Sequence, residues 1–326
     1  MAAQVTTETW DVGWTHVTRN IRNRLTDNIF DEYPTLEWFK SSKAVEIEEG
    51  GSEIQEPLLY GKNAGQWFES DDPLNTKAVD GVTSAFFQWR FIAVPVSISM
   101  TEERKAAGHA RFAKKLIETK AEQSMLTARD VVSAALFSSA SGKAMLGFQD
   151  VIKDTPTVGS LGGIDQSSSA QSWFRNQTNA SGGNFDDLDS ENQYTGINSM
   201  AALFNNCSSG NTMPERIITT LTLYSEWQQI NISGNFARQA SDKAKGFDAR
   251  KATFMGATVD FDRDCASGHM YMLNPRFLKL KILQGMNFAK TPFKEPVDQF
   301  AKVSFVLVGL QLVTNNPRRL GVVQFT

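Results

Sequence analysis

The sequence is poor in the residues that carry out most enzyme and metal chemistry. Its 326 residues include three histidines and two cysteines. Cys207 and Cys265 are too few for a disulfide framework or a four-cysteine zinc site, and they fit a reducing compartment such as the cytoplasm. Acid–base, nucleophilic and metal sites rely most often on His and Cys. Their scarcity therefore favours a binding or structural protein over an enzyme.

Long apolar runs and strong positive charge are also missing. No stretch approaches 18 uninterrupted apolar residues, so we expect no transmembrane helix. Residues 1–10 have neither the basic nor the apolar region of a signal peptide, so none is expected. The formal net charge of −3 argues against a protein that binds nucleic acid through bulk positive charge. With 41% hydrophobic and 21% charged residues the chain should be globular, and its length predicts two domains or one elaborated domain.

The familiar motifs of nucleotide binding and hydrolysis are absent. Gly142 and Lys143 are followed by Ala144 rather than by the Ser or Thr of a phosphate-binding loop. The sequence contains neither G-x-G-x-x-G nor the G-x-S-x-G of a nucleophile elbow. It therefore predicts no cofactor site and no serine nucleophile.

Metal ligands and reactive thiols are not indicated either. Asp260, Asp262 and Asp264 alternate as the first ligands of a calcium loop do, but the glycine and the terminal Glu of that loop are missing. We expect these carboxylates to face outward at the end of a strand. The three histidines are isolated in the sequence, and we expect Cys265 to be a structural thiol. No catalytic or metal site is predicted.

The first periodic segment is an amphipathic helix over residues 11–30. Apolar residues recur at steps of three and four, at Trp14, Val17, Ile21 and Leu25. Three arginines lie off that stripe, at Arg19, Arg22 and Arg24. Pro34 is expected to end the helix. Two interpretations stay open: a first core helix, or an arm that packs on a neighbouring subunit.

Residues 43–98 are typical of β-structure with a long polar interruption. Strands are predicted at 44–47 and 54–60, with a glycine turn between them and Pro57 at a sheet edge. Residues 61–84 are polar, and a loop of this length is often functional or reaches another surface. Phe87, Trp89 and Phe91 then alternate, and the alternation changes phase around Pro95, which predicts a bulge or twist.

The clearest predicted element is a helix over residues 99–138. Ser99 and Glu102 match a capping box, apolar residues follow helical spacing, and Gly142 is a plausible stop. At 1.5 Å per residue such a helix is on the order of 55 Å long. No heptad pattern is sustained, so we expect a spine across an elongated subunit rather than a coiled coil.

The second half of the chain mixes loops, helices and strands. Residues 155–212 are rich in Ser, Gly and Asn and predict long surface loops, with one helix over 188–206. A further helix is expected over 222–230. Strands are predicted at 217–221, 253–261, 270–273, 278–283, 303–314 and 321–325. This order favours an α+β fold over a doubly wound sheet.

Charge is distributed unevenly along the chain. Residues 44–80 hold nine acids against two lysines, and residues 276–326 hold eight bases against two acids. Both regions could be solvated faces. The alternative hypothesis is that the acidic segment of one copy docks on the basic segment of another, with aromatic residues of the polar loop as anchors. The candidate contact residues are Glu46, Glu48, Glu49, Glu53, Tyr60, Trp67, Phe68, Lys279, Lys281, Arg318 and Arg319.

The order of these segments resembles the major capsid proteins of tailed bacteriophages, with the Hong Kong 97-like fold. Short stretches of sequence resemble that family at 86–90 and 96–102, where its extended loop returns to its spine helix, and at 162–165 with 173–175. Further similar stretches are 254–260, 270–274 and 312–321. Each stretch alone is weak evidence, and the ordered set over nearly the whole chain carries the resemblance.

The resemblance implies a non-catalytic shell subunit without a cofactor. Its segments would be an N-terminal arm (1–43), an extended loop (44–84), a peripheral domain with the spine helix 99–138 (85–144), an axial domain (145–270) and closing peripheral strands (271–326). Copies would form hexamers and pentamers of an icosahedral shell around packaged double-stranded DNA, assembled in the bacterial host cytoplasm. Other implied partners are scaffolding, portal and decoration proteins, and DNA through non-specific contact; no membrane is involved.

Three other functions stay open at this stage. An encapsulin-type nanocompartment shell would use the same fold. A minor capsid or decoration protein would not close shells alone. A carbohydrate-active enzyme is suggested by the abundant Trp and acidic residues, although no pair of carboxylates stands out.

Overall fold

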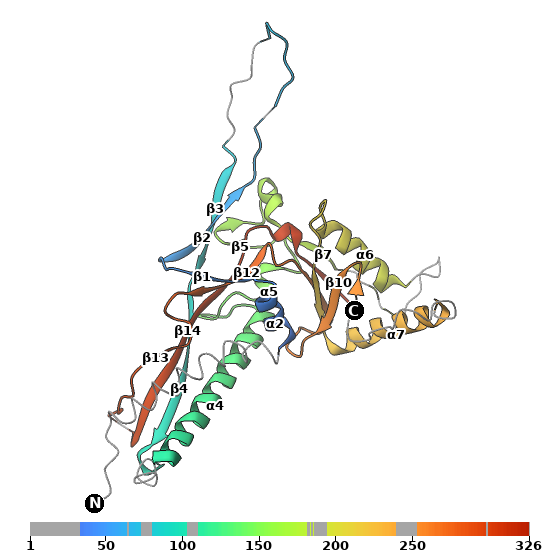
Figure 1. The fold of residues 1–326 in the computed structure, drawn as a ribbon. Coiled ribbons are helices and arrows are strands. Elements are labelled where there is room, and N and C mark those ends of the chain that lie inside the picture. The colour runs from blue at the N-terminus through green and yellow to red at the C-terminus, as the bar shows by residue number, and fades with distance from the viewer. Residues whose placement is uncertain are drawn as a thin grey trace, which may run out of the picture.

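The computed structural model describes residues 33–325 except for 64, 73–79, 103–109, 181–182, 184, 186–193, 239–252 and 298. Within two helical stretches, 110–116 and 231–238, it describes the backbone alone. Figure 1 shows an elongated subunit in which a long β-ribbon and one helix run side by side, a second sheet lies to one side, and a narrow loop projects from the end. The predicted helix over 11–30 lies outside the described residues.

The first sheet forms the long axis of the subunit. Its strands are β1 (Val45–Glu48), β4 (Arg90–Ser99), β12 (Leu278–Leu283), β13 (Ala289–Lys290) and β14 (Ala301–Thr314). β1 pairs in parallel with β12, and β14 pairs antiparallel with β12, β13 and β4. Alternate residues of β4, namely Val94, Val96 and Ile98, are buried beneath α4 (Ala110–Phe137). The hydroxyl of Ser124 on α4 donates to the carbonyl of Pro95 at 3.0 Å, which fixes the helix over the ribbon.

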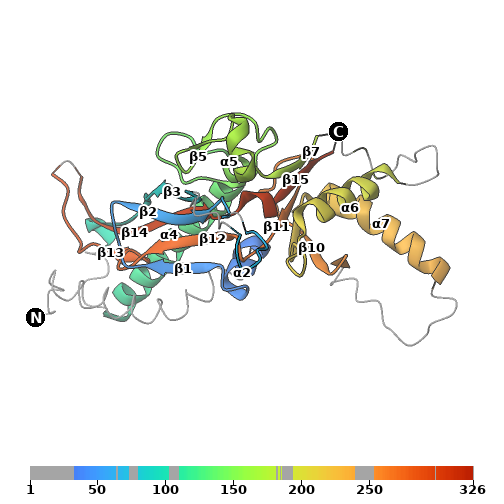
Figure 2. The ribbon, with the colours of Figure 1, turned by 90° about the horizontal axis from the view of Figure 1, so that it is seen from above.

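The second sheet has six strands and carries two helices. In spatial order the strands are β7 (Gln177–Asn179), β15 (Gly321–Gln324), β11 (His269–Leu273), β8 (Arg216–Thr219), β10 (Ala257–Phe261) and β9 (Thr253–Phe254). The helices α6 (Thr195–Cys207) and α7 (Leu221–Arg238) lie against this sheet (Figure 2). A Cβ on Gly321 would lie 2.7 Å from the Cys207 sulfur, so glycine allows the close approach of β15 to α6.

A separate hairpin supports the projecting loop. It consists of β2 (Glu53–Leu59) and β3 (Val82–Gln88), and its inward residues are Ile54, Leu58, Ala85 and Phe87. The amide of Phe86 donates to the carbonyl of Gly162 at 2.9 Å. Gly162 lies in the turn between β5 (Ser160–Leu161) and β6 (Ile164–Asp165), just before the 3-10 helix η1 (Ser169–Phe174). The base of the hairpin is therefore fixed to the body of the subunit.

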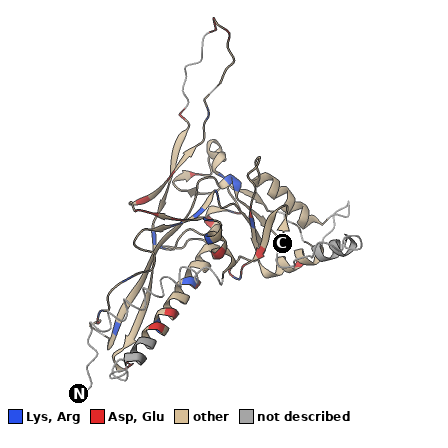
Figure 3. Cartoon of the chain, viewed as in Figure 1, with Lys and Arg blue, Asp and Glu red and all other residues tan. Residues whose placement is uncertain are grey.

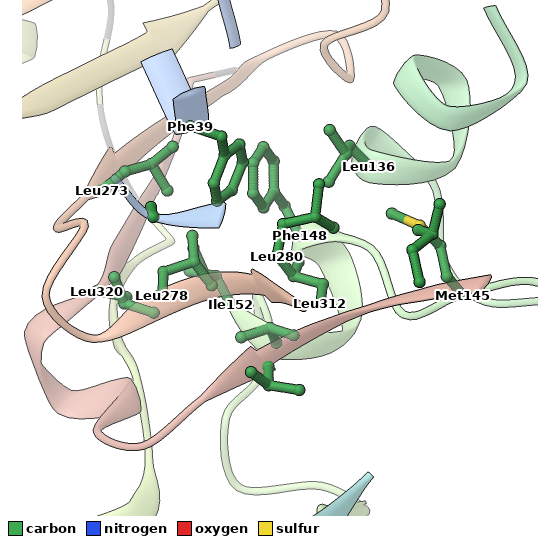
Figure 4. Packing of buried hydrophobic residues seen from close by; sticks show 14 of the residues in the cluster. Phe39, Leu136, Met145, Phe148, Ile152, Leu273, Leu278, Leu280, Leu312 and Leu320 are labelled. Atoms are coloured by element: carbon green, nitrogen blue, oxygen red, sulfur yellow. The ribbon is translucent and has the colours of Figure 1, made fainter. Parts of the chain in front are cut away.

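One hydrophobic core joins the two sheets. Phe148 on the short helix α5 (Phe148–Val151) is fully buried, and its ring meets Phe39 of α2 (Pro34–Ser41), Phe137 of α4 and Tyr271 of β11 at centroid distances of 6.3, 5.1 and 5.6 Å. Leu280 and Leu312 from the first sheet complete the cluster (Figure 4). Elements that are distant in sequence thus share one set of side chains.

A single carboxylate, that of Asp150, holds the sharp turn between α4 and α5. Asp150 accepts hydrogen bonds from the amides of Ala140 and Gly147 at 2.7 and 3.0 Å and from the hydroxyl of Ser139 at 2.8 Å. This carboxylate satisfies backbone donors that would otherwise be buried without a partner. Asp150 therefore fixes the position of Phe148 relative to α4.

The structure confirms the predicted α+β class and corrects several element predictions. Pro34 begins α2, because its fixed φ and missing N–H suit the first helical position, and the helix that it was expected to end lies outside the described residues. Phe91 was expected to share a face with Phe87 and Trp89, but it is exposed, since the strand breaks at Trp89 rather than at Pro95. The predicted strand over 253–261 is two strands, β9 and β10, joined at Met255 and Gly256.

The helix predictions are largely confirmed where the chain is described. α4 covers most of the predicted spine, residues 100–102 are also helical, and 103–109 lie outside the described residues. α7 is longer than predicted, and α6 begins at Thr195 rather than at 188, with 188–193 outside the described part. Two observations bear on the predicted domain boundaries: position 270 falls inside β11, and β15 joins the second sheet.

Substitution of Gly147 by alanine should lower the free energy of unfolding far more than a Gly→Ala change in the projecting loop. A Cβ at Gly147 would lie 1.9 Å from the carbonyl oxygen of Ser138 and 2.6 Å from that of Ala135, so the α4–α5 turn would have to move. We expect a loss of at least about 3 kcal/mol in the free energy of unfolding by urea denaturation. Gly65→Ala is the control: its Cβ would meet nothing within 4 Å. An equal effect of both changes would contradict this account of the turn.

Candidate inter-subunit surface

The charges at the start of the predicted extended loop are paired within the chain. The parallel register of β1 and β12 sets Glu46 opposite Lys281 and Glu48 opposite Leu283. In this register Lys279 forms an ion pair with Glu46, and Lys281 forms one with Glu48. The sequence hypothesis had assigned these four residues to two different copies. Their main electrostatic partners lie instead in the same subunit.

Lys281 is the centre of a nearly buried charge cluster. Its side chain is 7% exposed, and its ammonium contacts the carboxylates of Glu48 and of Glu56 on β2, with Glu46 at 4.0 Å. Burial alone would lower the pKa of Lys281, but the hydrogen bonds and charges of Glu48 and Glu56 outweigh it and raise the pKa. The cluster therefore joins β1, β12 and the hairpin strand β2. The sequence analysis missed Glu56, because only the fold brings the hairpin strand β2 close to Lys281 of β12.

The remaining charged candidates lie apart from this cluster. Glu49 and Glu53 are exposed at the glycine turn between β1 and β2. Arg318 is exposed on the 3-10 helix η2 (Pro317–Arg319), whereas Arg319 donates to the carbonyl of Ser208, at the end of α6, at 3.1 Å. The basic segment is thus divided between two regions of the subunit. It does not form one continuous face.

The aromatic candidates in the projecting loop separate into two groups. Tyr60 stacks on Trp173 of η1, with ring centroids 5.2 Å apart, and belongs to the base of the loop. Trp67 is 102% exposed and Phe68 is 62% exposed, farther along the loop. Exposed side chains of this size in neighbouring positions are typical of contact surfaces. Trp67 and Phe68 are therefore the free anchors of the predicted contact set.

The β4–β14 ribbon exposes an apolar face that the sequence analysis did not identify. Phe305 pairs with Pro95 and Phe91 pairs with Gly309, so these residues share the face opposite α4. Phe91 and Phe305 are 57% and 41% exposed. A Cβ on Gly309 would lie 3.0 Å from the Phe91 ring, so glycine allows this ring to approach β14 closely. The sequence signal for this face was that β14 carries apolar residues at both its inward and its outward positions.

The described residues contain no group of side chains arranged to bind a metal ion. No three His, Cys, Asp or Glu side chains among them gather as a metal site. Burial raises the pKa of both thiols, that of Cys207 to about 12, so both stay protonated at neutral pH. His269 contacts the Ser267 carbonyl at 2.7 Å and the Asp154 carboxylate at 3.0 Å, and is not isolated. His16 and His109 lie outside the described residues.

The three alternating aspartates do not all face outward, as the sequence analysis had expected. Asp262 is buried, where its carboxylate accepts the hydroxyl of Thr35 at 2.6 Å. Asp260 pairs with Arg216 across the parallel strands β8 and β10. Asp264 accepts the hydroxyl of Ser133 on α4 at 2.5 Å. The cluster links α2, α4 and the end of β10, and it is structural.

Comparison with known proteins gives a fold but no close relative. No family model matches the sequence, and no curated protein matches it. The capsid asymmetric unit of cyanophage A-1(L) is 14% identical with a TM-score of 0.59, covering 86% of this chain and 90% of that chain. The capsid of an empty GTA particle is 11% identical with a TM-score of 0.57, covering 87% and 88%. The capsid of Myoviridae phage XM1 is 11% identical with a TM-score of 0.53, covering 89% and 92%.

These comparisons confirm the fold that the sequence resemblance implied. The chain has the α+β fold of phage capsid proteins over most of its length. In the part of the chain that the structure describes, no helix is long and apolar enough to cross a membrane.

Lys281→Met should destabilise the subunit more than the same change two residues away. The substitution leaves the Glu56 carboxylate, 14% exposed, without its cation. We expect a loss of about 2–3 kcal/mol by urea denaturation, below the cost of breaking a fully buried pair because Glu48 stays partly solvated. Lys279→Met is the matched control, since Lys279 is 30% exposed and, among the described residues, pairs with Glu46 alone, and should cost below about 1 kcal/mol. Equal losses would show that the cluster is not a buried ion pair.

The same cluster should give the subunit a distinct alkaline pH dependence. The pKa of Lys281 is raised in the folded state, so its stabilising contribution is complete below the unfolded value of about 10.4 and is lost as pH rises through the folded value. We expect the wild type to lose more unfolding free energy than Lys281→Met between pH 9 and pH 11.5. Parallel curves for the two proteins would contradict this assignment.

Proposed function

We propose that this chain is the major capsid protein of a tailed bacteriophage. Its copies would assemble into hexamers and pentamers of an icosahedral shell that encloses packaged double-stranded DNA. The observation that carries the proposal is the capsid fold, which extends over nearly nine-tenths of the chain, together with a projecting loop that ends in free aromatic side chains.

The contact between copies would rest on apolar surface more than on charge. Trp67 and Phe68 of one subunit would cover the ribbon face of a neighbour around Phe91 and Phe305. Burial of each large ring contributes about 1.5–3 kcal/mol, whereas an exposed ion pair contributes about 0–1 kcal/mol. Because Glu46, Glu48, Lys279 and Lys281 are already paired internally, they are weak candidates for cross-subunit pairs. Glu49, Glu53 and Arg318 are left to set the register of the contact.

The other partners follow from the same proposal. Scaffolding, portal and decoration proteins would act on the assembled shell. DNA contact would be weak and independent of base sequence, because the net charge is −3. The chain would have no enzymatic activity, and its location would be the virion capsid after assembly in the host cytoplasm.

Removal of the two loop rings should abolish assembly without unfolding the subunit. We expect wild-type chains, expressed alone or with the genes encoded beside it, to give large particles by light scattering and negative-stain microscopy. The variant Trp67→Ala/Phe68→Ala should stay subunit-sized with an unchanged unfolding midpoint, since neither ring packs in the subunit core. Val158→Ala removes apolar surface from another exposed position, 62% exposed, and should assemble normally.

Three results would count against the proposal. A wild type that never forms particles would contradict the shell function itself. Particles from the double variant would contradict the loop contact but leave the shell function intact. Particles filled with a protein cargo instead of DNA would favour an encapsulin-type compartment.

A further inference from the structure

We propose that Asp80 is a site of spontaneous backbone modification, at which the Asp80–Gly81 peptide bond is converted to an isoaspartyl bond through a cyclic imide. The site lies at the neck of the projecting loop, where β2 ends and β3 begins, and the hydroxyl of Tyr60 favours the reaction. The inference concerns chemistry within one subunit and does not depend on the proposed shell function.

The sequence contains a single pair of residues with this reactivity. The imide forms when the amide nitrogen that follows an aspartate attacks the side-chain carboxyl group, and a glycine in the second position favours it because no side chain obstructs the approach. Asp80–Gly81 is the only Asp–Gly pair in the 326 residues, and the sequence has no Asn–Gly pair. Asp80 is exposed, and Figure 3 shows acidic positions on the projecting loop in red.

The packing of the loop neck requires the glycine of this pair. A Cβ on Gly81 would lie 2.7 Å from the carbonyl oxygen of Gly61, so any other residue would push the two backbone segments apart. The carbonyl of Gly81 accepts hydrogen bonds from the amides of Tyr60 and Gly61 at 2.8 and 3.2 Å. The Gly81 nitrogen, which is the nucleophile of the reaction, takes no part in these two bonds. The close approach at the neck thus keeps a glycine directly after Asp80.

The hydroxyl of Tyr60 stabilises the reactive form of this peptide unit. It donates to the main-chain carbonyl oxygen of Asp80 at 3.0 Å. The Gly81 nitrogen attacks after it has lost its proton, and the negative charge that results is shared with this oxygen. A donor placed at the atom where charge develops lowers the barrier, as it does in an oxyanion hole. The ring of Tyr60 stacks on Trp173 with centroids 5.2 Å apart, which holds the hydroxyl in position.

The reaction needs no co-reactant other than water. The Gly81 nitrogen forms a bond to the side-chain carboxyl carbon of Asp80, and the hydroxyl of the protonated carboxyl group leaves with the amide proton as water. A water molecule then adds to the imide carbonyl that belonged to the main chain, and the original bond between Asp80 and Gly81 breaks. The backbone now runs through the side chain and is one methylene group longer, and the former main-chain carbonyl is a free carboxylate.

The longer backbone does not fit the present packing of the neck. Gly81 lies too close to Gly61 to admit a Cβ, so an added methylene group next to Gly81 must displace one of the two segments. The hydrogen bonds from the amides of Tyr60 and Gly61 to the Gly81 carbonyl would shift or break with it. The modification would therefore change how the projecting loop leaves the hairpin.

Prolonged incubation of the folded full chain at physiological temperature and pH tests the proposal. Asp80 is the only acid in the tryptic peptide 78–90, and electron-transfer fragmentation of this peptide distinguishes isoaspartate from aspartate. We expect isoaspartate to accumulate at Asp80, preceded by a form that is one water molecule lighter. Asp71 is an internal control, since it is exposed in the same loop but is followed by Asp72, and it should stay unmodified. Hydrogen exchange at the amides of Tyr60 and Gly61 should be faster in the modified protein.

Two variants separate the chemistry from the fold. Tyr60→Phe keeps the ring and removes the hydroxyl, and it should slow the accumulation about fivefold, the factor that one hydrogen bond supplies. Asp80→Glu keeps the charge but would have to close a larger ring, and it should accumulate no modified form at this position. The unfolding midpoints of both variants should equal that of the wild type before incubation.

The outcomes that would overturn the proposal are distinct. Absence of isoaspartate at Asp80 in the wild type, or an amount no greater than that at Asp71, would overturn the modification site. A rate in Tyr60→Phe that equals or exceeds the wild-type rate would overturn the role of the Tyr60 hydroxyl.

Discussion

The packing of Phe148 between the two sheets is the interaction on which the rest of the subunit depends. Its ring touches α2, α4 and β11, so one side chain fixes three elements that are far apart in sequence. Asp150, two residues later, holds the turn that presents this ring to the core. Because interiors are close-packed, a shift of α4 would be felt at β11 and in the second sheet. The ribbon, the hairpin and the second sheet therefore share one packed core, and the projecting loop starts from that core.

The ion pairs of Lys281 also fix the position of the hairpin relative to the first sheet. Lys281 draws Glu48 and Glu56 together from either side of the glycine turn at Gly50 and Gly51, where both φ angles are positive. Positive φ near 130° is accessible almost solely to glycine, so the backbone can reverse there and place Glu56 beside the lysine. A buried charge cluster is weak as a source of stability but specific in geometry. Its effect here is to define how β2 leaves the first sheet.

Local patterns in the sequence were enough to predict most elements and the class of the fold. Contacts between residues far apart in the sequence could not be predicted from such patterns. The alternation in 303–314 and the helical spacing in 112–136 predicted β14 and most of α4, because each pattern lies within one element. The ion pair of Glu46 with Lys279 joins residues 233 positions apart, and only the parallel register of β1 with β12 brings them together. Net charge counted along the chain therefore suggested two opposing surfaces, whereas the fold pairs Glu46 and Glu48 with Lys279 and Lys281 inside one subunit. Asp262 was misjudged for the same reason, since its partner Thr35 comes from the other end of the chain.

The division between paired charge and free apolar surface has a consequence for how such a subunit would associate. Charges that are satisfied internally gain little from a second partner, because the desolvation cost of a new contact is not offset by a new ion pair. Rings left in water, such as Trp67, Phe91 and Phe305, gain free energy from any partner that covers them. Selectivity must then come from the shape of the apolar surfaces, and the stacking of Tyr60 on Trp173 fixes the point from which the loop leaves the subunit. The placement of the exposed rings, more than the surface charge, would decide which neighbour fits.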